Sequence, residues 1–165
     1  QTSAADRVTD EIIERAQHIA ETTMTVLKGA GIFGIEMFVT KDNQILINEI
    51  APRVHNSGHH TLQSSETSQF EQHLKAILGL NLEDTKLIYN TVMHNILGSD
   101  EFSGEYESFN VSEEGVFLKM YGKKISKPLR KLGHINLVGL NGESIEDLLK
   151  KLSLMKQKLV IKPSA

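Results

Sequence analysis

The chain has 165 residues, 39% hydrophobic and 24% charged, a composition typical of one ordinary globular domain or part of one. Its 18 Lys and Arg against 21 Asp and Glu give a formal net charge of −3, which argues against a dedicated nucleic-acid binder, and the absence of cysteine excludes disulfides and cysteine-ligated zinc. No apolar run reaches the roughly 18 residues that span a bilayer, and no signal peptide is visible, so we expect a cytoplasmic protein with no membrane partner. The chain begins with Gln1 in a polar stretch, and we expect it to have been cut from something longer.

Two helices and a hairpin are predicted in the first half of the chain. Apolar residues at helical spacing predict a helix over about residues 6–28, ended by the glycines that follow. Residues 32–40 and 44–50 are rich in β-forming residues and flank a polar turn, which predicts a β-hairpin. After a polar loop over residues 53–60, the capping-box spacing of residues 68–71 predicts the start of the second helix.

The second half of the chain is predicted to be mainly β. After an acidic connection at 98–114, a basic loop joins two of the strands. The expected elements are strands at 86–96, 115–121 and 132–138, a helix at 144–154 and a final edge strand at 159–162. The element order predicts an α+β (mixed α/β) fold with mainly antiparallel sheet. We expect a boundary between residues 1–83 and a smaller β-rich lobe at residues 84–165.

The predicted hairpin places two acidic residues side by side. With a two-residue turn at residues 42–43, Phe38 lies opposite Ile47 and Glu36 lies opposite Glu49. Opposed side chains share a face of the sheet, with Cα atoms about 4.5–5.5 Å apart. The residues that alternate with Glu36 are expected on the opposite, buried face: Phe33, Ile35, Met37 and Val39.

Two carboxylates on one strand face need a compensating cation. Mg²⁺ is the natural candidate, because it prefers oxygen ligands and is often held by one or two carboxylates plus substrate phosphates. Asn48 could add a neutral oxygen if the strand bulges, since strict alternation turns it to the other face. A solvated strand face with two chance acids is the alternative interpretation, and no HExxH spacing supports zinc.

The loop after the hairpin is rich in hydrogen-bond donors. Arg53 offers a two-pronged guanidinium for carboxylate, bicarbonate or phosphate. His55 could orient a reacting group or transfer a proton near neutral pH, although an ordinary turn histidine is the alternative. His59 and His60 are weaker candidates. Such a loop beside a metal pair suits an anionic ligand.

The loop between the two later strands is strongly basic. No acid occurs between residues 119 and 131, which suits either a solvated hairpin tip or a clamp for a small phosphorylated substrate. Nucleic acid is a weaker option, because no aromatic platform alternates with the charges. The six basic residues are Lys119, Lys123, Lys124, Lys127, Arg130 and Lys131.

Two motifs resemble a known family. Residues 34–38 read Gly-Ile-Glu-Met-Phe, and residues 48–59 read Asn-Glu-Ile-Ala-Pro-Arg-Val-His-Asn-Ser-Gly-His. On these motifs the sequence resembles the 5-(carboxyamino)imidazole ribonucleotide synthase family, ATP-grasp enzymes of de novo purine synthesis. The longer motif is highly specific, whereas many ATP-grasp enzymes have something similar to the shorter one. Further matches cover essentially the whole chain: residues 67–74, 78–80, 95–98, 121–123 and 130–136.

The resemblance implies carboxylation of 5-aminoimidazole ribonucleotide by bicarbonate, with ATP as co-substrate, Mg²⁺ as metal and carboxyphosphate as intermediate. It implies that Glu36 and Glu49 bind the metal, that Asn48 and Glu49 belong to the nucleotide site, and that Arg53 and His55 hold bicarbonate or carboxyphosphate. The remaining residues implied to contact substrate are Asn56, Ser57, Lys123, Arg130 and Lys131. The resemblance also implies a homodimer.

The sequence departs from the family in two respects. Members often read Arg-Pro-Gly-Arg-Lys where this chain has Lys-Pro-Leu-Arg-Lys at residues 127–131. The family's N-terminal domain and glycine-rich phosphate loop have no counterpart here, so we expect the C-terminal portion of such an enzyme, inactive by itself. Two rivals stay open: another ATP-grasp ligase, such as formate-dependent glycinamide ribonucleotide transformylase, and a non-catalytic interaction module.

Overall fold

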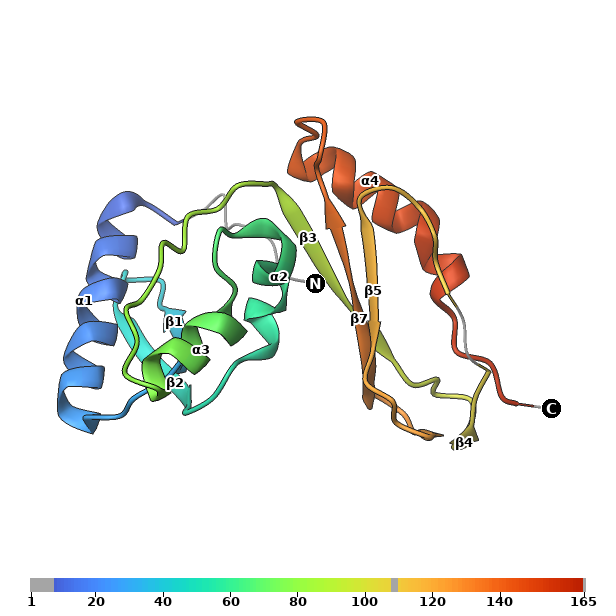
Figure 1. Cartoon of the computed structure of the whole chain (residues 1–165), viewed down its shortest axis with the longest axis horizontal. Helices are drawn as coiled ribbons and strands as arrows, with labels where there is room; N and C mark the ends of the chain where they lie inside the picture. Colours follow the sequence, from blue (N-terminus) through green and yellow to red (C-terminus); the bar gives the residue numbers. More distant parts are fainter. Residues whose placement is uncertain (1–7, 108–109, 165) are drawn as a thin grey trace. The chain divides into compact units, whose positions relative to one another are not determined.

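The computed structural model describes residues 8–107 and 110–164, which divide into two compact units (Figure 1). The hairpin unit takes in residues 8–62 and 66–86, and the sheet unit takes in residues 63–65 and the described residues from 87 onward. Across the described residues, no helix is long and apolar enough to cross a bilayer. Helices and antiparallel strands occur together, which confirms the predicted α+β class.

The hairpin unit begins with helix α1 (Asp10–Leu27), which confirms the predicted first helix. The Thr9 side chain accepts a hydrogen bond from the Ile12 N–H (3.4 Å), and Lys28 ends the helix in the left-handed conformation (φ 53°). The first two positions of the predicted helix, residues 6 and 7, lie outside the described residues. Ile12 is the buried residue of the apolar face.

Strands β1 (Gly34–Val39) and β2 (Ile45–Ala51) form the predicted hairpin, but its turn differs from the prediction. The Thr40 N–H donates to the Gln44 carbonyl (2.9 Å) and the Asn43 N–H to the Thr40 carbonyl (3.0 Å), which leaves a three-residue loop. Asn43 ends that loop in the left-handed conformation (φ 58°), the usual construction of a three-residue hairpin. The predicted two-residue turn is therefore wrong.

The longer turn shifts the strand register near the hairpin tip. Phe38 pairs with Leu46 and Met37 with Ile47, so the predicted pairing of Phe38 with Ile47 is wrong by one residue. The register then shifts at a β-bulge between Met37 and Glu36, and Glu36 pairs with Glu49 as predicted. The predicted buried face is only partly covered within the described residues, since Met37 is half-buried and Val39 is 45% exposed.

The polar loop after β2 is more ordered than predicted. Its second half forms a 3₁₀-helix, η1 (Asn56–His60), and leads directly into the single-turn helix α2 (Thr61–Ser64). Helix α3 (Gln69–Ile77) confirms the second predicted helix, and the Ser68 hydroxyl accepts from the Glu71 N–H (3.3 Å) as its spacing predicts.

The sheet unit is built on three antiparallel strands in the order β3–β7–β5. The long strand β7 (Lys131–Val138) is central, with β3 (Thr91–Leu97) and β5 (Val116–Met120) on its two sides. Helix α4 (Ile145–Met155) runs along this sheet (Figure 1) and shares an apolar core with it. Fully or nearly fully buried side chains of that core include Val92, Ile135, Leu137, Leu148 and Leu152.

A capping box fixes the start of α4, the helix predicted at residues 144–154. The Asp147 N–H donates to the Ser144 hydroxyl (3.2 Å), and the Ser144 N–H donates to the Asp147 carboxylate (3.2 Å). The Ser144 hydroxyl also donates to this carboxylate (2.6 Å), and these bonds hold the pKa of Asp147 below its usual range.

Two secondary-structure predictions in the sheet unit need correction, and one pair of strands was not predicted. The predicted edge strand at residues 159–162 is wrong, because the helix continues into η2 (Lys156–Leu159), and the described tail beyond it forms a single bridge, between Pro163 and Tyr106. The predicted strand at 86–96 begins at Thr91. A short pair, β4 (Gly104–Glu105) and β6 (Ile125–Ser126), was not predicted.

Candidate functional site

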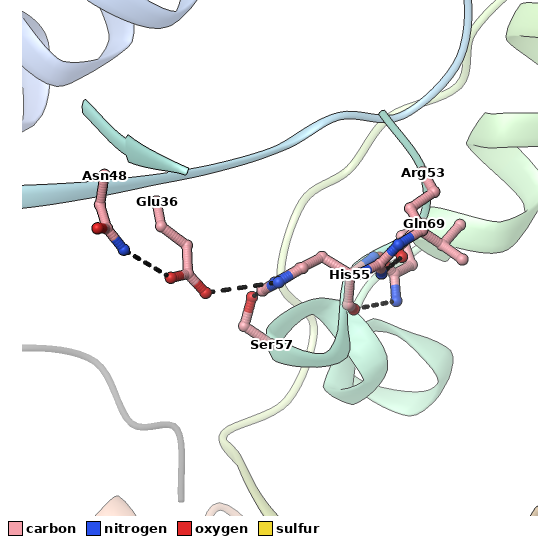
Figure 2. A network of polar contacts seen from close by, with 7 residues as sticks. Glu36, Asn48, Arg53, His55, Ser57 and Gln69 are labelled. Carbon is pink, nitrogen blue, oxygen red and sulfur yellow. Dashed lines mark hydrogen bonds and ion pairs between the residues drawn. The ribbon is translucent and has the colours of Figure 1, made fainter. Parts of the chain in front are cut away.

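The β-bulge of the hairpin gathers three oxygen- and nitrogen-bearing side chains. Glu36 and Glu49 are paired across the strands, which places both carboxylates on one face. Asn48 is the extra residue between the two registers, and its amide donates to the Glu36 carboxylate (Nδ2 to Oε2, 3.3 Å; Figure 2). The bulge thus turns Asn48 toward the acidic pair, which unbroken alternation would prevent.

His55 lies beside this pair and links it to the following loop. Its Nε2 is 3.4 Å from Glu36 Oε1, and its Nδ1 is 2.8 Å from the Ser57 hydroxyl (Figure 2). The imidazole is largely buried, with 17% of its side chain exposed, whereas 47% of the Glu36 side chain is exposed. His55 can therefore pass on or hold a proton between a solvent-accessible carboxylate and a hydroxyl.

Arg53 occupies the loop two residues before His55. Its guanidinium donates to the Val54 carbonyl (Nη1 to O, 3.0 Å), and the side chain is exposed. Because the side chain is exposed, its other N–H groups can donate to a small anion that arrives from solvent. Asn56, half-buried, and Ser57, exposed, open the 3₁₀-helix that follows.

The sequence analysis missed Gln69, the first residue of α3. Its amide makes hydrogen bonds with both backbone groups of His55 (Figure 2) and with the ring of His59. The local pattern indicates a helix start at this residue, and nothing in it reveals a contact across 14 residues. The neighbouring His60 is partly buried, which lowers its pKa and favours the neutral ring.

The acidic pair suits a hard, oxygen-seeking cation that a substrate helps to bind. Among the described residues, no group of three or more His, Cys, Asp or Glu side chains is arranged to hold a metal ion by itself. Glu36 and Glu49 are two carboxylates on one face, the donor set typical of Mg²⁺ when phosphate oxygens complete the coordination. The residues present therefore fit Mg²⁺ held jointly with a nucleotide, and they do not fit a zinc site.

The predicted basic residues belong to the other unit, around the loop between β5 and β7. The Lys123 ammonium donates to the Lys131 carbonyl (2.6 Å) and lies 5.7 Å from the Tyr121 ring centroid. The Arg130 guanidinium donates to the Ile125 carbonyl (2.9 Å). These bonds tie the Lys123 and Arg130 side chains to the backbone of their own loop. Lys131 is exposed.

Leu129 carries the conformational cost of this loop. It has φ 59° and is 73% exposed. The family that the sequence resembles often has glycine at this position. A non-glycine residue in the left-handed region costs about 1–2 kcal/mol, and glycine loses about 0.5–1 kcal/mol through backbone entropy. We expect Leu129→Gly to raise the free energy of unfolding by about 0.5–1 kcal/mol in urea titrations of the chain.

A second exposed leucine provides the control for this measurement. Leu154 lies in α4 and is 79% exposed, so Leu154→Gly removes a similar surface side chain from a right-handed helix. It should lower the free energy of unfolding by about 1 kcal/mol. A loss of stability for Leu129→Gly as well would contradict the strain argument.

Comparison with known proteins identifies both parts of the chain. Residues 1–70 match the ATP-grasp domain family, and residues 91–148 match the phosphoribosylaminoimidazole carboxylase C-terminal domain family. The fold and these matches therefore define an ATP-grasp class of protein. The chain belongs to the N5-carboxyaminoimidazole ribonucleotide synthase family and matches part of its members' length.

Curated relatives agree with this placement. The phosphoribosylaminoimidazole carboxylase of Ogataea methanolica is 42% identical over 144 residues, which cover 82% of this chain and 26% of that protein. The N5-carboxyaminoimidazole ribonucleotide synthase of Vibrio vulnificus is 43% identical over 129 residues, which cover 78% of this chain and 33% of that protein. The chain thus spans about a quarter to a third of the length of these relatives.

Solved structures show the same fold. The N5-carboxyaminoimidazole ribonucleotide synthetase of Thermotoga maritima matches with a TM-score of 0.86 and 41% identity, over 98% of this chain and 45% of that one. The Aspergillus clavatus N5-carboxyaminoimidazole synthase, solved with ADP and 5-aminoimidazole ribonucleotide, matches with a TM-score of 0.77 and 28% identity, over 94% of this chain and 42% of that one. These relatives are ligases of the ATP-grasp class.

Proposed function

We propose that this chain supplies the metal and bicarbonate ends of an active site that carboxylates 5-aminoimidazole ribonucleotide at the expense of ATP. The observation that carries the proposal is the Glu36–Glu49 pair beside the His55 ring, within a specific family match. The product is 5-(carboxyamino)imidazole ribonucleotide, formed through carboxyphosphate in de novo purine biosynthesis. The proposed setting is the cytoplasm, and the proposed assembly is a homodimer.

The acidic face has an electrostatic role in this proposal. A bound Mg²⁺ would supply positive charge that stabilises the ATP phosphates during attack by bicarbonate. Glu36 and Glu49 would hold the metal, and the Asn48 amide keeps the Glu36 carboxylate oriented through its hydrogen bond. Asn48 and Glu49 would also border the nucleotide.

The loop after the hairpin has a binding role. Arg53 would pair with the planar anion through its guanidinium, as carboxylate-like groups favour. His55, oriented by Glu36 and Ser57, would position this anion or take up a proton as the carboxylate is transferred. Asn56 and Ser57 would line the substrate side of the same loop.

The basic loop of the sheet unit would bind the ribonucleotide phosphate. Lys123, Arg130 and Lys131 lie within nine residues of one another in the chain, and Lys123 and Arg130 are anchored by backbone carbonyls. Anchored cations lose less side-chain entropy on binding a phosphate, which would favour binding of the ribonucleotide.

A graft tests the activity. This chain is placed in the Thermotoga maritima relative in exchange for the segment it matches, and ADP release is measured. We expect release that requires bicarbonate and is stimulated by 5-aminoimidazole ribonucleotide. A response to formate and glycinamide ribonucleotide would indicate the rival transformylase, and no response to either pair would favour a non-catalytic module.

A further inference from the structure

We propose that Gln69 is a positioning residue that holds the Arg53–His55 loop in its working conformation by clamping the backbone of His55. This inference rests on the proposed function, because it concerns the same site. It adds a residue that touches neither metal nor substrate in the proposal and acts only through its neighbours.

The clamp uses both ends of the Gln69 amide. The His55 N–H donates to Gln69 Oε1 (2.9 Å), and Gln69 Nε2 donates to the His55 carbonyl (2.8 Å). Nε2 also lies 2.9 Å from His59 Nδ1, so its second hydrogen meets a ring nitrogen that must be unprotonated to accept it. Both amide hydrogens and the amide oxygen are thereby used, which fixes the amide orientation.

The base of the clamp is rigid. Gln69 is 8% exposed and is the first residue of α3, and its own N–H donates to the Thr61 hydroxyl (3.0 Å). That hydroxyl donates in turn to the Gly58 carbonyl (2.6 Å), inside the 3₁₀-helix that follows His55. The helix, the 3₁₀-turn and the loop are therefore joined through one buried amide and one hydroxyl.

Two glycines show how closely the loop is packed. A Cβ atom at Gly58 would lie 2.6 Å from Gln69 Oε1, and a Cβ atom at Gly34 would lie 2.7 Å from the Cβ of His55. His55 is thus packed closely against β1 at Gly34, and its backbone is hydrogen-bonded to the Gln69 amide (Figure 2). Gln69 therefore holds the backbone of His55, while the ring of His55 contacts Glu36 and Ser57.

The same helix contains a natural control for the clamp. Gln72 is 4% exposed, accepts from the Glu83 N–H (3.2 Å) and donates to the Glu83 carbonyl. It is therefore also a buried glutamine that clamps both backbone groups of one residue, but Glu83 is not a proposed site residue. Gln69→Leu and Gln72→Leu each remove one such clamp from α3, and both should lower the melting temperature.

The test measures turnover and melting temperature for both variants in the graft. Because misplacing a reacting group by about 1 Å can cost about 10²-fold in rate, we expect Gln69→Leu to lower kcat about 10²-fold with KM for ATP within twofold of wild type. Gln72→Leu should keep kcat within twofold of wild type. If kcat falls in both variants in the same proportion to their loss of melting temperature, the inference is overturned. Full turnover of Gln69→Leu would overturn it as well.

A spectroscopic arm separates failure of the clamp from failure of the proposed function. If the wild-type graft shows no bicarbonate-dependent turnover, the proposed function fails, and the clamp is read from NMR of the 165-residue chain. Gln69→Leu should shift the backbone resonances of Arg53 and His55 and speed hydrogen exchange at the His55 amide, and Gln72→Leu should leave both unchanged. Unchanged His55 signals in Gln69→Leu would overturn the inference.

Discussion

Glu49→Gln is expected to lower turnover of the graft about 10³-fold or more without weakening the fold. In the proposed reaction Glu49 is half of the metal-binding pair, and metal-ion stabilisation of a phosphoryl transition state contributes several kcal/mol. Since about 1.4 kcal/mol corresponds to a tenfold change in rate, loss of one carboxylate accounts for about three orders of magnitude. The measurement is ADP release across a range of Mg²⁺ concentrations.

The fold should tolerate this substitution because Glu49 is exposed and glutamine keeps its shape. Removing one of two opposed like charges should even relieve repulsion across the strands. Glu14→Gln, at an exposed position on α1, is the matched control and should keep wild-type turnover. Wild-type turnover of Glu49→Gln at every Mg²⁺ concentration would refute the paired-carboxylate site and leave two solvated acids on a strand.

Arg53→Ala is expected to reduce bicarbonate-dependent ADP release about 10²–10³-fold while ATP binding changes little. The reason is that a donor aimed at a developing anion typically contributes this factor to the rate, and the nucleotide end of the proposed site lies with Glu49 and Asn48 instead. Stability should change little, since the Arg53 side chain is exposed. Single-turnover ADP formation and ATP affinity are measured on the same graft.

Arg53→Lys is the control that separates the effect of the positive charge from the effect of the planar guanidinium. Lysine keeps the positive charge but lacks the planar fork, so its rate should lie between those of wild type and Arg53→Ala. Equal losses in ATP affinity and in ADP formation would show that Arg53 serves the nucleotide instead, and the bicarbonate role would be given up.

The sequence predicted the acidic pair but not the path by which the hairpin reaches it. An even number of residues separates Glu36 from Glu49, so a two-residue turn with regular strands pairs them. A three-residue turn with one bulge pairs them equally well, and this is the arrangement observed. Local composition at residues 41–44 does not distinguish the two turns, because Asp and Asn suit both.

The element types of the sheet unit were predictable for a different reason. Helix α4 carries its start signal within four residues, Ser144 to Asp147, and its buried leucines repeat at helical spacing. The predicted strand at residues 159–162 failed because its apolar residues, including Leu159 and Ile161, fill the core from a 3₁₀-turn and an extended tail. An alternating apolar pattern records burial, and it does not by itself record pairing with another strand.

The supporting contacts of the site were beyond any local pattern. Gln69 meets His55 only after the chain has passed through a 3₁₀-helix and a single-turn helix, neither of which was predicted. Candidate reactive residues follow from residue type, whereas the residues that hold them follow from the three-dimensional path.

Because of the bulge at Asn48, the pairing of Glu36 with Glu49 depends on the number of strand residues on each side of the turn. The left-handed residue at the tip, Asn43, adds one residue to the turn, and the strand on the return side absorbs it as the bulge. Deleting one residue of β2 between the turn and the bulge, with the three-residue turn kept, would leave the strands out of step by one, and Glu49 would face away from Glu36 unless the bulge also closed. Insertions and deletions in the strands of this hairpin should therefore be tolerated in compensating pairs, so the strand residues between the surface turn and the site are constrained in number by the residue that orients Glu36.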